Sequence, residues 1–349
     1  MVSETVSDKL SGFPVVFAHA ISGRWYAQTI YTATKLGVFD KLSKTEIKSI
    51  DQLAKEVNAY PAYLYRVLRA IADIGLVTET ANREFTVTDD GAFLQSDHPL
   101  TLRDACLLEQ STEHVMVWNH MTDSVIYGPS SKTGFEIEYG SPWETYLQTH
   151  AEYGAVFHRA MSSYTSNEAQ AIAAVYKTEL PHAKVICDIG GSFGTLLEAI
   201  IGAAPETKEA VVLELPSAVK EATENPQLEE LRKKVKFVAG DMFKDSIKAD
   251  AYFLKHILHD WDQEHCLKIL QQARKGAEPG AKIYICELVV PAPGIADLSK
   301  IMDLHMLIVN KGEEKTLPEY EKLLASSGWK LEKMYRTLGP SSIVAGVAV

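Results

Sequence analysis

The chain has 349 residues, of which 46% are hydrophobic and 23% charged, and its 35 basic and 46 acidic side chains give a formal net charge of −11. This balance excludes a disordered chain, and the length predicts two domains. No apolar run reaches the roughly 18 residues of a membrane-spanning helix, and the polar, acidic start does not resemble a signal peptide. We therefore expect a cytoplasmic protein without a membrane partner.

The acidic balance, without a block of basic residues, argues against a nucleic-acid partner. The four cysteines lie far apart in mostly apolar surroundings and form no CxxC pair, so we expect neither a disulfide framework nor a zinc site, and no other metal. These cysteines are Cys106, Cys187, Cys266 and Cys286.

The sequence pattern of the N-terminal part predicts a mainly helical domain. Residues 13–42 have apolar side chains at helical spacing on more than one face, which fits either an ordinary pair of buried helices or a subunit interface. Residues 49–99 follow the pattern helix, turn, helix and two short strands, which is typical of a winged helix. Such a module often binds DNA, but four basic against eight acidic residues give this segment a charge of −4 and favour a scaffold or a lid.

The middle of the chain, residues 100–176, also looks mainly helical. It contains a helix candidate over 157–174 and a loop rich in Gly, Ser and Pro over 127–142. Because such loops often lie over binding sites, this one could close over a ligand.

From residue 185 the pattern changes to strands separated by helical stretches of about 12 to 18 residues. Repeated βα units predict a doubly wound, Rossmann-like parallel sheet with right-handed crossovers. The last two strands, 329–338 and 341–349, are close enough in sequence to form an antiparallel hairpin. We therefore expect an α/β fold with domains at 1–100, 101–176 and 177–349.

A glycine-rich loop follows the first strand of this sheet, with the sequence DIGGSFG over 188–194. Its glycines would let a ligand approach the backbone and the start of the next helix closely. Glu214 ends the second strand, where a carboxylate would accept hydrogen bonds from ribose hydroxyls. Asp241 and Met242 end the third strand, where they could flank an adenine.

These strand ends predict a nucleoside pocket, because an open α/β sheet binds ligands at the carboxyl ends of its strands. They do not by themselves decide between NAD and S-adenosylmethionine, although the absence of the spacing GxGxxG favours the latter. The alternative is that these acidic residues only cap helices and turns.

The most specific motif is LKHILHDW over 254–261. Together with DIGGSFG, LELP, GDMF, CELVVP and DLHML, in this order, it resembles the S-adenosylmethionine-dependent small-molecule O-methyltransferases, the family of plant phenolic and bacterial antibiotic methyltransferases. The similarity covers nearly the whole chain. It implies a C-terminal class I methyltransferase sheet with an antiparallel last strand, a mainly α-helical winged-helix dimerisation domain at the N-terminus, and a homodimer.

The resemblance also implies roles for individual residues. His259 stands where the family has its catalytic base, Glu314 would orient it with Glu287 as the second candidate, and Asp260 would help to hold the substrate or the base. The residues expected to bind S-adenosylmethionine, and its product S-adenosylhomocysteine, are Asp188, Gly190, Gly191, Glu214, Leu215, Gly240, Asp241, Met242, Phe243, Lys255 and Thr165.

Two positions depart from the family pattern. Ser192 replaces the last glycine of the GGG in DxGGGxG, and Glu214 stands where many relatives have Asp, so its carboxylate must reach the ribose across one more methylene. Neither change removes a group that cofactor binding needs. His256, by contrast, is expected to be structural.

The acceptor should be a small aromatic or enolic molecule, so its pocket should have apolar walls. The residues expected to bind it are Phe157, Met161, Trp118, Met302, Met306, His305 and Asp303, and ordinary packing is the alternative for each. Phe17 could reach the pocket of a partner subunit.

The predicted function is transfer of a methyl group to a phenolic or enolic hydroxyl of a secondary metabolite. Within the same fold, the alternatives are N-methylation, or retention of the cofactor for decarboxylation, hydroxylation or a pericyclic step. From other classes, a winged-helix transcription regulator and a cofactor-free dimeric scaffold are the alternatives.

Overall fold

The computed structural model describes residues 15–349, with side chains from residue 20 onward. Residues 13 and 14 of the first helical segment, and the side chain of Phe17 that was expected to reach a partner subunit, lie outside the described residues.

The chain divides into two compact units, and each is described by itself. The first unit holds the residues up to 115 and residues 150–164, and the second holds residues 116–149 and 165–349. The long helix α10, Ala151–Glu179, contributes residues to both units. The predicted middle region, 101–176, is thus shared between them.

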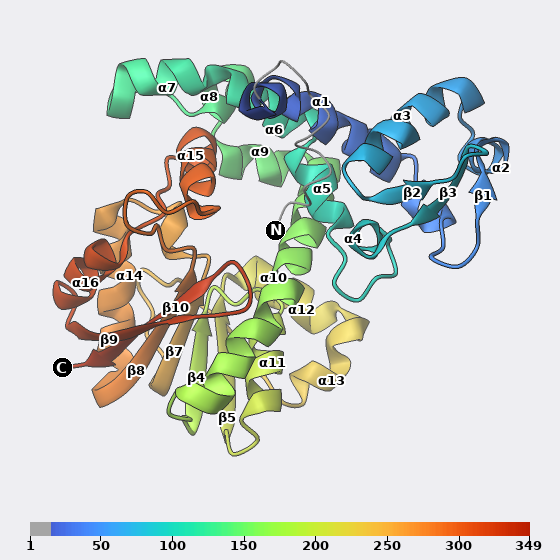
Figure 1. Cartoon of the computed structure of the whole chain (residues 1–349). Helices are drawn as coiled ribbons and strands as arrows, with labels where there is room; N and C mark the ends of the chain where they lie inside the picture. Colours follow the sequence, from blue (N-terminus) through green and yellow to red (C-terminus); the bar gives the residue numbers. More distant parts are fainter. Residues whose placement is uncertain (1–14) are drawn as a thin grey trace. The chain divides into compact units, whose positions relative to one another are not determined.

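The first unit is mainly helical around a small antiparallel sheet of order β1-β3-β2 (Figure 1). A capping box between Ser49 and Gln52 begins α2, and Pro61 occupies the first turn of α3. The predicted pattern of helix, turn, helix and two strands is confirmed, and β1 is an additional strand of only two residues. The elements are α1 Val15–Lys35, β1 Lys48–Ser49, α2 Ile50–Glu56, α3 Pro61–Asp73, β2 Val77–Glu79, β3 Glu84–Val87, α4 Asp89–Ala92, α5 Arg103–Glu109 and α6 Thr112–Val117.

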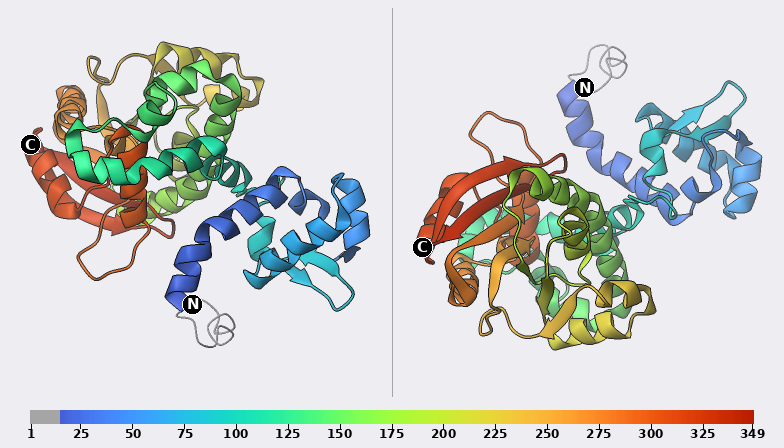
Figure 2. Two further views of the ribbon diagram at one scale, coloured as in Figure 1. Left: turned by 90° about the horizontal axis from the view of Figure 1, so that it is seen from above. Right: turned by 90° about the horizontal axis from the view of Figure 1, so that it is seen from below.

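The second unit is built on a seven-stranded sheet of order β6-β5-β4-β7-β8-β10-β9. Strands β6, β5, β4, β7 and β8 pair in parallel, whereas β10 runs antiparallel to both β8 and β9. Figure 2 shows β9 and β10, in red, at one edge of the sheet. The strands are β4 Val185–Ile189, β5 Glu209–Glu214, β6 Lys236–Ala239, β7 Ala249–Lys255, β8 Ala277–Glu287, β9 Trp329–Arg336 and β10 Ser342–Ala348. The prediction of a Rossmann-like sheet with an antiparallel last strand is confirmed.

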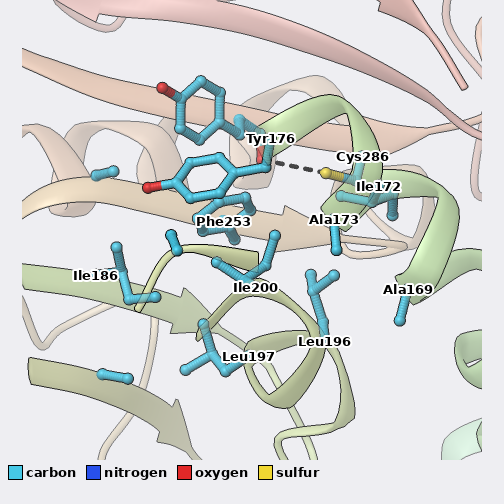
Figure 3. Close-up of a cluster of buried hydrophobic side chains, with 14 of the residues drawn as sticks. Ala169, Ile172, Ala173, Tyr176, Ile186, Leu196, Leu197, Ile200, Phe253 and Cys286 are labelled. Carbon is cyan, nitrogen blue, oxygen red and sulfur yellow. Dashed lines mark hydrogen bonds between the residues drawn. The ribbon is translucent and has the colours of Figure 1, made fainter. Parts of the chain in front are cut away.

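Successive side chains of each strand point to opposite faces of this sheet, and both faces are covered by helices that bury the apolar ones. On β4, Ile186 packs into a cluster with α10 and α11, and its neighbour Cys187 packs into a second cluster with α14 and α16. Figure 3 shows the first cluster, in which Tyr176 of α10 lies against Phe253 of β7. The helices of this unit that follow α10 are α11 Thr195–Ala203, α12 Pro216–Glu224, α13 Glu229–Arg232, α14 Gln263–Gly276, α15 Ser299–Asn310 and α16 Leu317–Ala325.

The segment 127–142, predicted as a loop, differs from that expectation because it contains a short helix. A capping box between Thr133 and Glu136 begins α8, Gly134–Glu138, and Phe135 within it is fully buried. A Cβ at Gly134 would lie 2.5 Å from a side-chain atom of Val117, so the start of α8 packs closely on its neighbours. Two further helices flank it, α7 Met121–Tyr127 and α9 Trp143–Thr149.

Across residues 15–349, none of the helices combines the length and the apolar character that crossing a bilayer requires.

Candidate active site

The groups predicted to bind the cofactor come together because parallel strands end at one edge of the sheet. Asp188 of β4 lies beside Phe253 of β7, and Glu214 of β5 lies beside Ala239 of β6. The glycine loop, the turn after β6 and the end of β7 therefore emerge side by side. This edge is where an open α/β sheet binds its ligand.

The glycine loop approaches its neighbours too closely for side chains at two positions. A Cβ at Gly190 would lie 2.4 Å from Cδ1 of Ile257, and one at Gly191 would lie 2.4 Å from a carboxylate oxygen of Asp188. Gly190 also has a φ of +72°. Ser192, the departure from the family pattern, has a φ of +48°, which is the left-handed region that favours glycine. The loop therefore forms a backbone cradle, and it adopts this conformation although Ser192 is strained.

Glu214 and Leu215 lie beside this loop. The Glu214 carboxylate accepts hydrogen bonds from the backbone N–H of Ser192 at 3.2 Å and of Leu215 at 2.7 Å. The Leu215 side chain is 54% exposed, so it presents an apolar surface next to the Glu214 carboxylate. A carboxylate beside an open apolar surface fits the ribose and the adenine face of a nucleoside.

The turn after β6 holds Gly240 to Phe243. Asp241 is turned toward its own loop: it accepts a hydrogen bond from the backbone N–H of Phe243 and pairs with Lys244 at 2.7 Å. The hydrogen bond from Lys244 lowers the pKa of the Asp241 carboxyl. Met242 and Phe243 are half-buried against the core. A Cβ at Gly240 would lie 2.7 Å from Cδ1 of Leu213, so a larger residue in this turn would have to displace the Leu213 side chain.

A buried ionic cluster joins α10 to the end of β7. One carboxylate oxygen of Glu168 lies 3.0 Å from Nζ of Lys255 and 2.8 Å from Nε2 of His256. The Lys255 ammonium also donates to the Thr165 hydroxyl at 3.4 Å. Burial would raise the pKa of the Glu168 carboxyl, but the neighbouring His256 and Lys255 side chains outweigh it and hold that pKa well below its usual range.

Glu168 is a site residue that the sequence interpretation missed. The sequence signal was its position, because this charged side chain stands one helical turn after Thr165 and directly before the apolar residues Ala169, Ile172 and Ala173 of the same helix. His256 has a φ of +51° and is held by Glu168, which agrees with the structural role expected for it.

Asp188 lies beneath the glycine loop and is 1% exposed. Among the described residues, neither of its carboxylate oxygens has a hydrogen-bond partner. Burial raises the pKa of this carboxyl to about 8, although the nearby Lys255 charge opposes the rise. A buried carboxyl without partners next to a backbone cradle fits a cationic ligand group, such as an ammonium.

His259 stands in a short helical turn, Leu258–Asp260, just after β7. Its Nδ1 lies 2.9 Å from Oε1 of Glu314, whose side chain is fully buried, and its Nε2 lies 3.7 Å from Oδ1 of Asp260. Burial lowers the pKa of the His259 imidazole, but the carboxylates of Asp260 and Glu314 outweigh burial and raise that pKa to about 9. Burial also raises the pKa of Asp260, which accepts a hydrogen bond from Asn310.

Glu287 contacts the histidine loop through the backbone rather than through the ring. One of its oxygens accepts hydrogen bonds from the backbone N–H of Ile257 at 3.1 Å and of Leu258 at 2.7 Å, and the other accepts from the Tyr320 hydroxyl. The structure thus places Glu314, and not Glu287, on the imidazole nitrogen. Glu287 positions the turn that carries the histidine.

Two further groups hold this turn, and the sequence interpretation did not include them. The buried ammonium of Lys315 donates to the backbone carbonyl of Leu258 at 3.2 Å. A Cβ at Gly312 would lie 2.1 Å from the carbonyl oxygen of His259, so only glycine fits there. We refer to Glu287, Tyr320 and Lys315 as the loop clamp.

Helix α15 carries four of the residues expected to bind the acceptor. Met306 is buried, and Met302, Asp303 and His305 are half-buried. Nε1 of Trp118 donates to Nδ1 of His305 at 3.2 Å, and the two rings are stacked. Asp303 accepts a hydrogen bond from the backbone N–H of Glu314, so it supports the partner of the histidine.

The remaining two expected acceptor residues, Phe157 and Met161, are half-buried on α10. They belong to the first unit, whereas Trp118 and the α15 residues belong to the second. Within the second unit, the structure thus brings Trp118 together with His305 of α15.

A parallel sheet with a reversed strand β10, a glycine cradle after β4 and a carboxylate after β5 is the arrangement expected of an S-adenosylmethionine-dependent methyltransferase. Comparison with known families agrees: residues 118–330 match the O-methyltransferase domain and residues 18–96 the O-methyltransferase dimerisation domain. The chain therefore belongs to the O-methyltransferase family. This membership favours the enzyme over the transcription regulator and the cofactor-free scaffold.

Among its relatives is the phenazine O-methyltransferase PhzM of Lysobacter antibioticus, 33% identical over 94% of each chain. The mitomycin biosynthesis 6-O-methyltransferase of Streptomyces lavendulae is 28% identical over 90% of this chain and 88% of its own length. Among solved structures, CalO1, a methyltransferase in calicheamicin biosynthesis, superposes with a TM-score of 0.85 at 27% identity, covers 96% of this chain and 98% of its own, and is described in its form bound to S-adenosylhomocysteine.

Proposed function

We propose that this O-methyltransferase methylates a phenolic or enolic hydroxyl of a small aromatic secondary metabolite, with His259 as the group that takes the hydroxyl proton. The observation that carries the proposal is the contact of 2.9 Å between the His259 ring and the fully buried Glu314 carboxylate. A phenol has a pKa of about 10 and the neighbouring carboxylates raise the pKa of the His259 imidazole to about 9, so transfer of the hydroxyl proton to the neutral imidazole is nearly balanced in free energy. The fraction of the ring that is neutral, and so able to take the proton, rises with pH toward about 9. The relatives named for phenazine and mitomycin support an aromatic, antibiotic-type acceptor.

We infer that the groups around His259 have separate roles. Glu314 binds Nδ1 of His259 and leaves Nε2 to face the hydroxyl, as the orienting carboxylate does in other histidine bases. Asp260 lies near Nε2 and stabilises the imidazolium once the proton has moved. The loop clamp fixes the distance between this nitrogen and the acceptor, and proximity of this kind accounts for much of the rate of a group transfer.

S-adenosylmethionine supplies a methyl group that its sulfonium already activates. We propose that Glu214 and Leu215 hold the ribose and adenine, with Gly240, Asp241, Met242 and Phe243 along the base, and that the backbone of Gly190 and Gly191 lines the cradle. Asp188, Lys255 and Thr165 would face the amino acid part, Asp188 its ammonium and the other two its carboxylate. Three observations support this fit: the buried partnerless Asp188, the cradle that a Cβ would fill, and the exposed Leu215.

We further propose that the protein is a cytoplasmic homodimer that works without metal or nucleic acid, and that segments 1–100, 101–176 and 177–349 serve dimerisation, acceptor binding and cofactor binding. The match to the dimerisation domain supports the first role. The exposed apolar residues Ile21 and Trp25 of α1, 57% and 67% exposed, give this helix an apolar surface that a second subunit would cover.

The experiment that tests the catalytic role compares His259→Asn with the wild type and with the surface control His265→Asn. His265 is a suitable control because its ring is exposed and bonded to Asp262. We expect His259→Asn to bind S-adenosylhomocysteine in calorimetry as the wild type does, while single-turnover methyl transfer falls by about 10²- to 10⁴-fold. Equal single-turnover rates in the two variants would refute the role of His259. Failure of the wild type to bind S-adenosylhomocysteine would refute the cofactor site.

A further inference from the structure

One ring nitrogen of His256 is bonded and the other is not. Its Nε2 lies 2.8 Å from a carboxylate oxygen of Glu168 and 3.4 Å from the hydroxyl oxygen of Ser341. Its Nδ1 is buried, and in the part of the chain that the structure describes this nitrogen has no hydrogen-bond partner. Buried polar atoms are nearly always bonded in native proteins, so an unbonded one beside an active site indicates a group that binds there.

The partners of Nε2 determine which nitrogen of the ring carries the hydrogen. The Glu168 carboxyl, whose pKa lies well below its usual range, is ionised and only accepts hydrogen bonds, so Nε2 must hold the hydrogen that it donates. The Lys255 ammonium lies 3.0 Å from the same carboxylate oxygen and already balances its charge. A second cation beside Lys255 would be repelled by it, so we assign a neutral ring to His256, with a lone pair on Nδ1.

The backbone holds this ring beside the proposed base. His256 has a φ of +51°, a left-handed conformation that costs energy for a residue with a side chain and that is often found at active sites. The centre of its ring lies 5.0 Å from that of the His259 ring, and the two ring planes are tilted by 32°. A molecule that presents a hydroxyl to His259 therefore brings its neighbouring substituent within reach of His256.

We infer that Nδ1 of His256 is a specificity-determining contact, which accepts a hydrogen bond from a second O–H or N–H group that the acceptor carries beside its methylated hydroxyl. This inference rests on the proposed function and specifies its substrate class. Catechols and 2-aminophenols supply the second hydrogen, whereas phenols with an ether or no polar group at that position do not. The bond of Nε2 to Glu168 keeps its structural role, and His256 takes no part in the proton transfer to His259.

Two other acceptor groups lie near His259. One oxygen of Glu314 is also unbonded within the described residues, but the side chain of Glu314 is fully buried, whereas that of His256 is 22% exposed. The side chain of Asp260 is 35% exposed, and one of its oxygens faces both Asn310 and His259. Asp260 is therefore the rival for the second hydrogen of the acceptor, and the test must separate it from His256.

The test compares methyl transfer to catechol and to hydroquinone, which both have two hydroxyls and differ in whether these are adjacent. One hydrogen bond of ordinary strength predicts that the wild type favours catechol about tenfold in kcat/KM. A ratio near one would overturn the inference. Because the ratio is taken within one protein, differences in folding or in cofactor binding between variants cancel.

Two substitutions separate the roles of the two nitrogens. The amide of glutamine can take the place of Nε2 and keep the bond to Glu168, but it supplies no acceptor in the place of Nδ1, whereas the amide of asparagine does the reverse. We expect His256→Gln to bind S-adenosylhomocysteine and to lose the preference for catechol, and His256→Asn to keep the preference and to bind S-adenosylhomocysteine more weakly. His265→Gln, at an exposed histidine, is the matched control and should keep the wild-type ratio. A preference that persists in His256→Gln would overturn the inference and point to Asp260.

A second measurement does not depend on turnover. In wild-type protein labelled with ¹⁵N-histidine and saturated with S-adenosylhomocysteine, Nδ1 of His256 should be unprotonated and unbonded at pH 7.5. Catechol should move its signal toward that of a hydrogen-bonded nitrogen, and hydroquinone should not.

Three outcomes of this measurement would overturn the inference. They are a protonated Nδ1, an Nδ1 that water or the cofactor already bonds before catechol is added, and equal shifts with the two phenols. If hydroxylated aromatics are methylated while either test fails, only the inference falls. If S-adenosylhomocysteine does not bind, the proposed function falls.

Discussion

Replacement of Asp188 by Asn should make the protein more stable at neutral pH. The carboxyl is 1% exposed and its oxygens have no hydrogen-bond partner in the described part of the chain. Burial raises its pKa to about 8 in the folded protein, whereas an aspartate in an unfolded chain has a pKa of about 3.9. The folded state therefore binds this proton more tightly than the unfolded state does.

The sign and size of the effect follow from that difference. Because the folded chain holds the proton more tightly, the free energy of unfolding falls as pH rises from about 4 to about 8. Each pH unit in this window removes about 1.4 kcal/mol, so the loss between pH 5 and pH 7 is about 3 kcal/mol. Asp188→Asn has no such ionisation, and its stability advantage over the wild type should grow by about that amount over the same interval.

Urea unfolding followed by circular dichroism at pH 5, 6 and 7 measures this difference, at one protein concentration because a dimer's stability depends on it. Asp97→Asn, in an exposed loop, is the control and should follow the wild type at each pH. Calorimetry should also show that Asp188→Asn binds S-adenosylhomocysteine more weakly, because a residue that lowers the stability of a protein is often one that its function requires. A constant difference between Asp188→Asn and the wild type across the pH range would refute the reasoning, because it would mean that Asp188 is already ionised in the folded protein at pH 5.

Three further substitutions test other parts of the site. Ser192→Gly should raise the free energy of unfolding by about 1 kcal/mol in a urea titration, because the serine has a φ of +48°; no gain would show that the backbone is not strained there. Glu168→Gln should weaken S-adenosylhomocysteine binding about tenfold in calorimetry, since the buried Lys255 ammonium loses its carboxylate partner, and an unchanged affinity would contradict that link. Gly312→Ala should lower turnover about tenfold or more while cofactor binding persists, because its Cβ would lie 2.1 Å from the carbonyl oxygen of His259; normal turnover would show that this loop tolerates displacement.

The fold and the family were predictable because their signals are local in the sequence. Alternating βα segments predict the sheet and the motif over 254–261 indicates the family; the strand order confirms the first and the family comparison the second. The ligand edge stays a prediction. The pairing of His259 with Glu314 depended on the resemblance, since 55 residues separate the two and no periodicity connects them. The roles of the individual site residues stay predictions that the experiments above address.

The contacts that were not predictable join segments far apart in the chain. Glu168 bonds His256 across 88 positions, and Glu287 bonds the turn before His259 across about 30. A sequence shows that such residues are charged, but only the packed structure shows that they are buried and which atom they bind. The helix within 127–142 was not predicted, for a related reason. The composition of this segment is that of a loop, and its short helix depends on the burial of Phe135, which only the structure shows.

The loop clamp has a consequence for how this enzyme could change its substrate over evolution. Glu287 and Lys315 bind N–H and carbonyl groups of Ile257 and Leu258, and every amino acid except proline supplies both groups. Side chains of α15 that are proposed to face the acceptor should therefore be exchangeable without displacing His259, except Asp303 and Asn310, which bond Glu314 and Asp260. A laboratory library that randomises Met302, His305 and Met306 and keeps Asp303 and Asn310 should yield enzymes that accept new molecules and keep the position of the histidine.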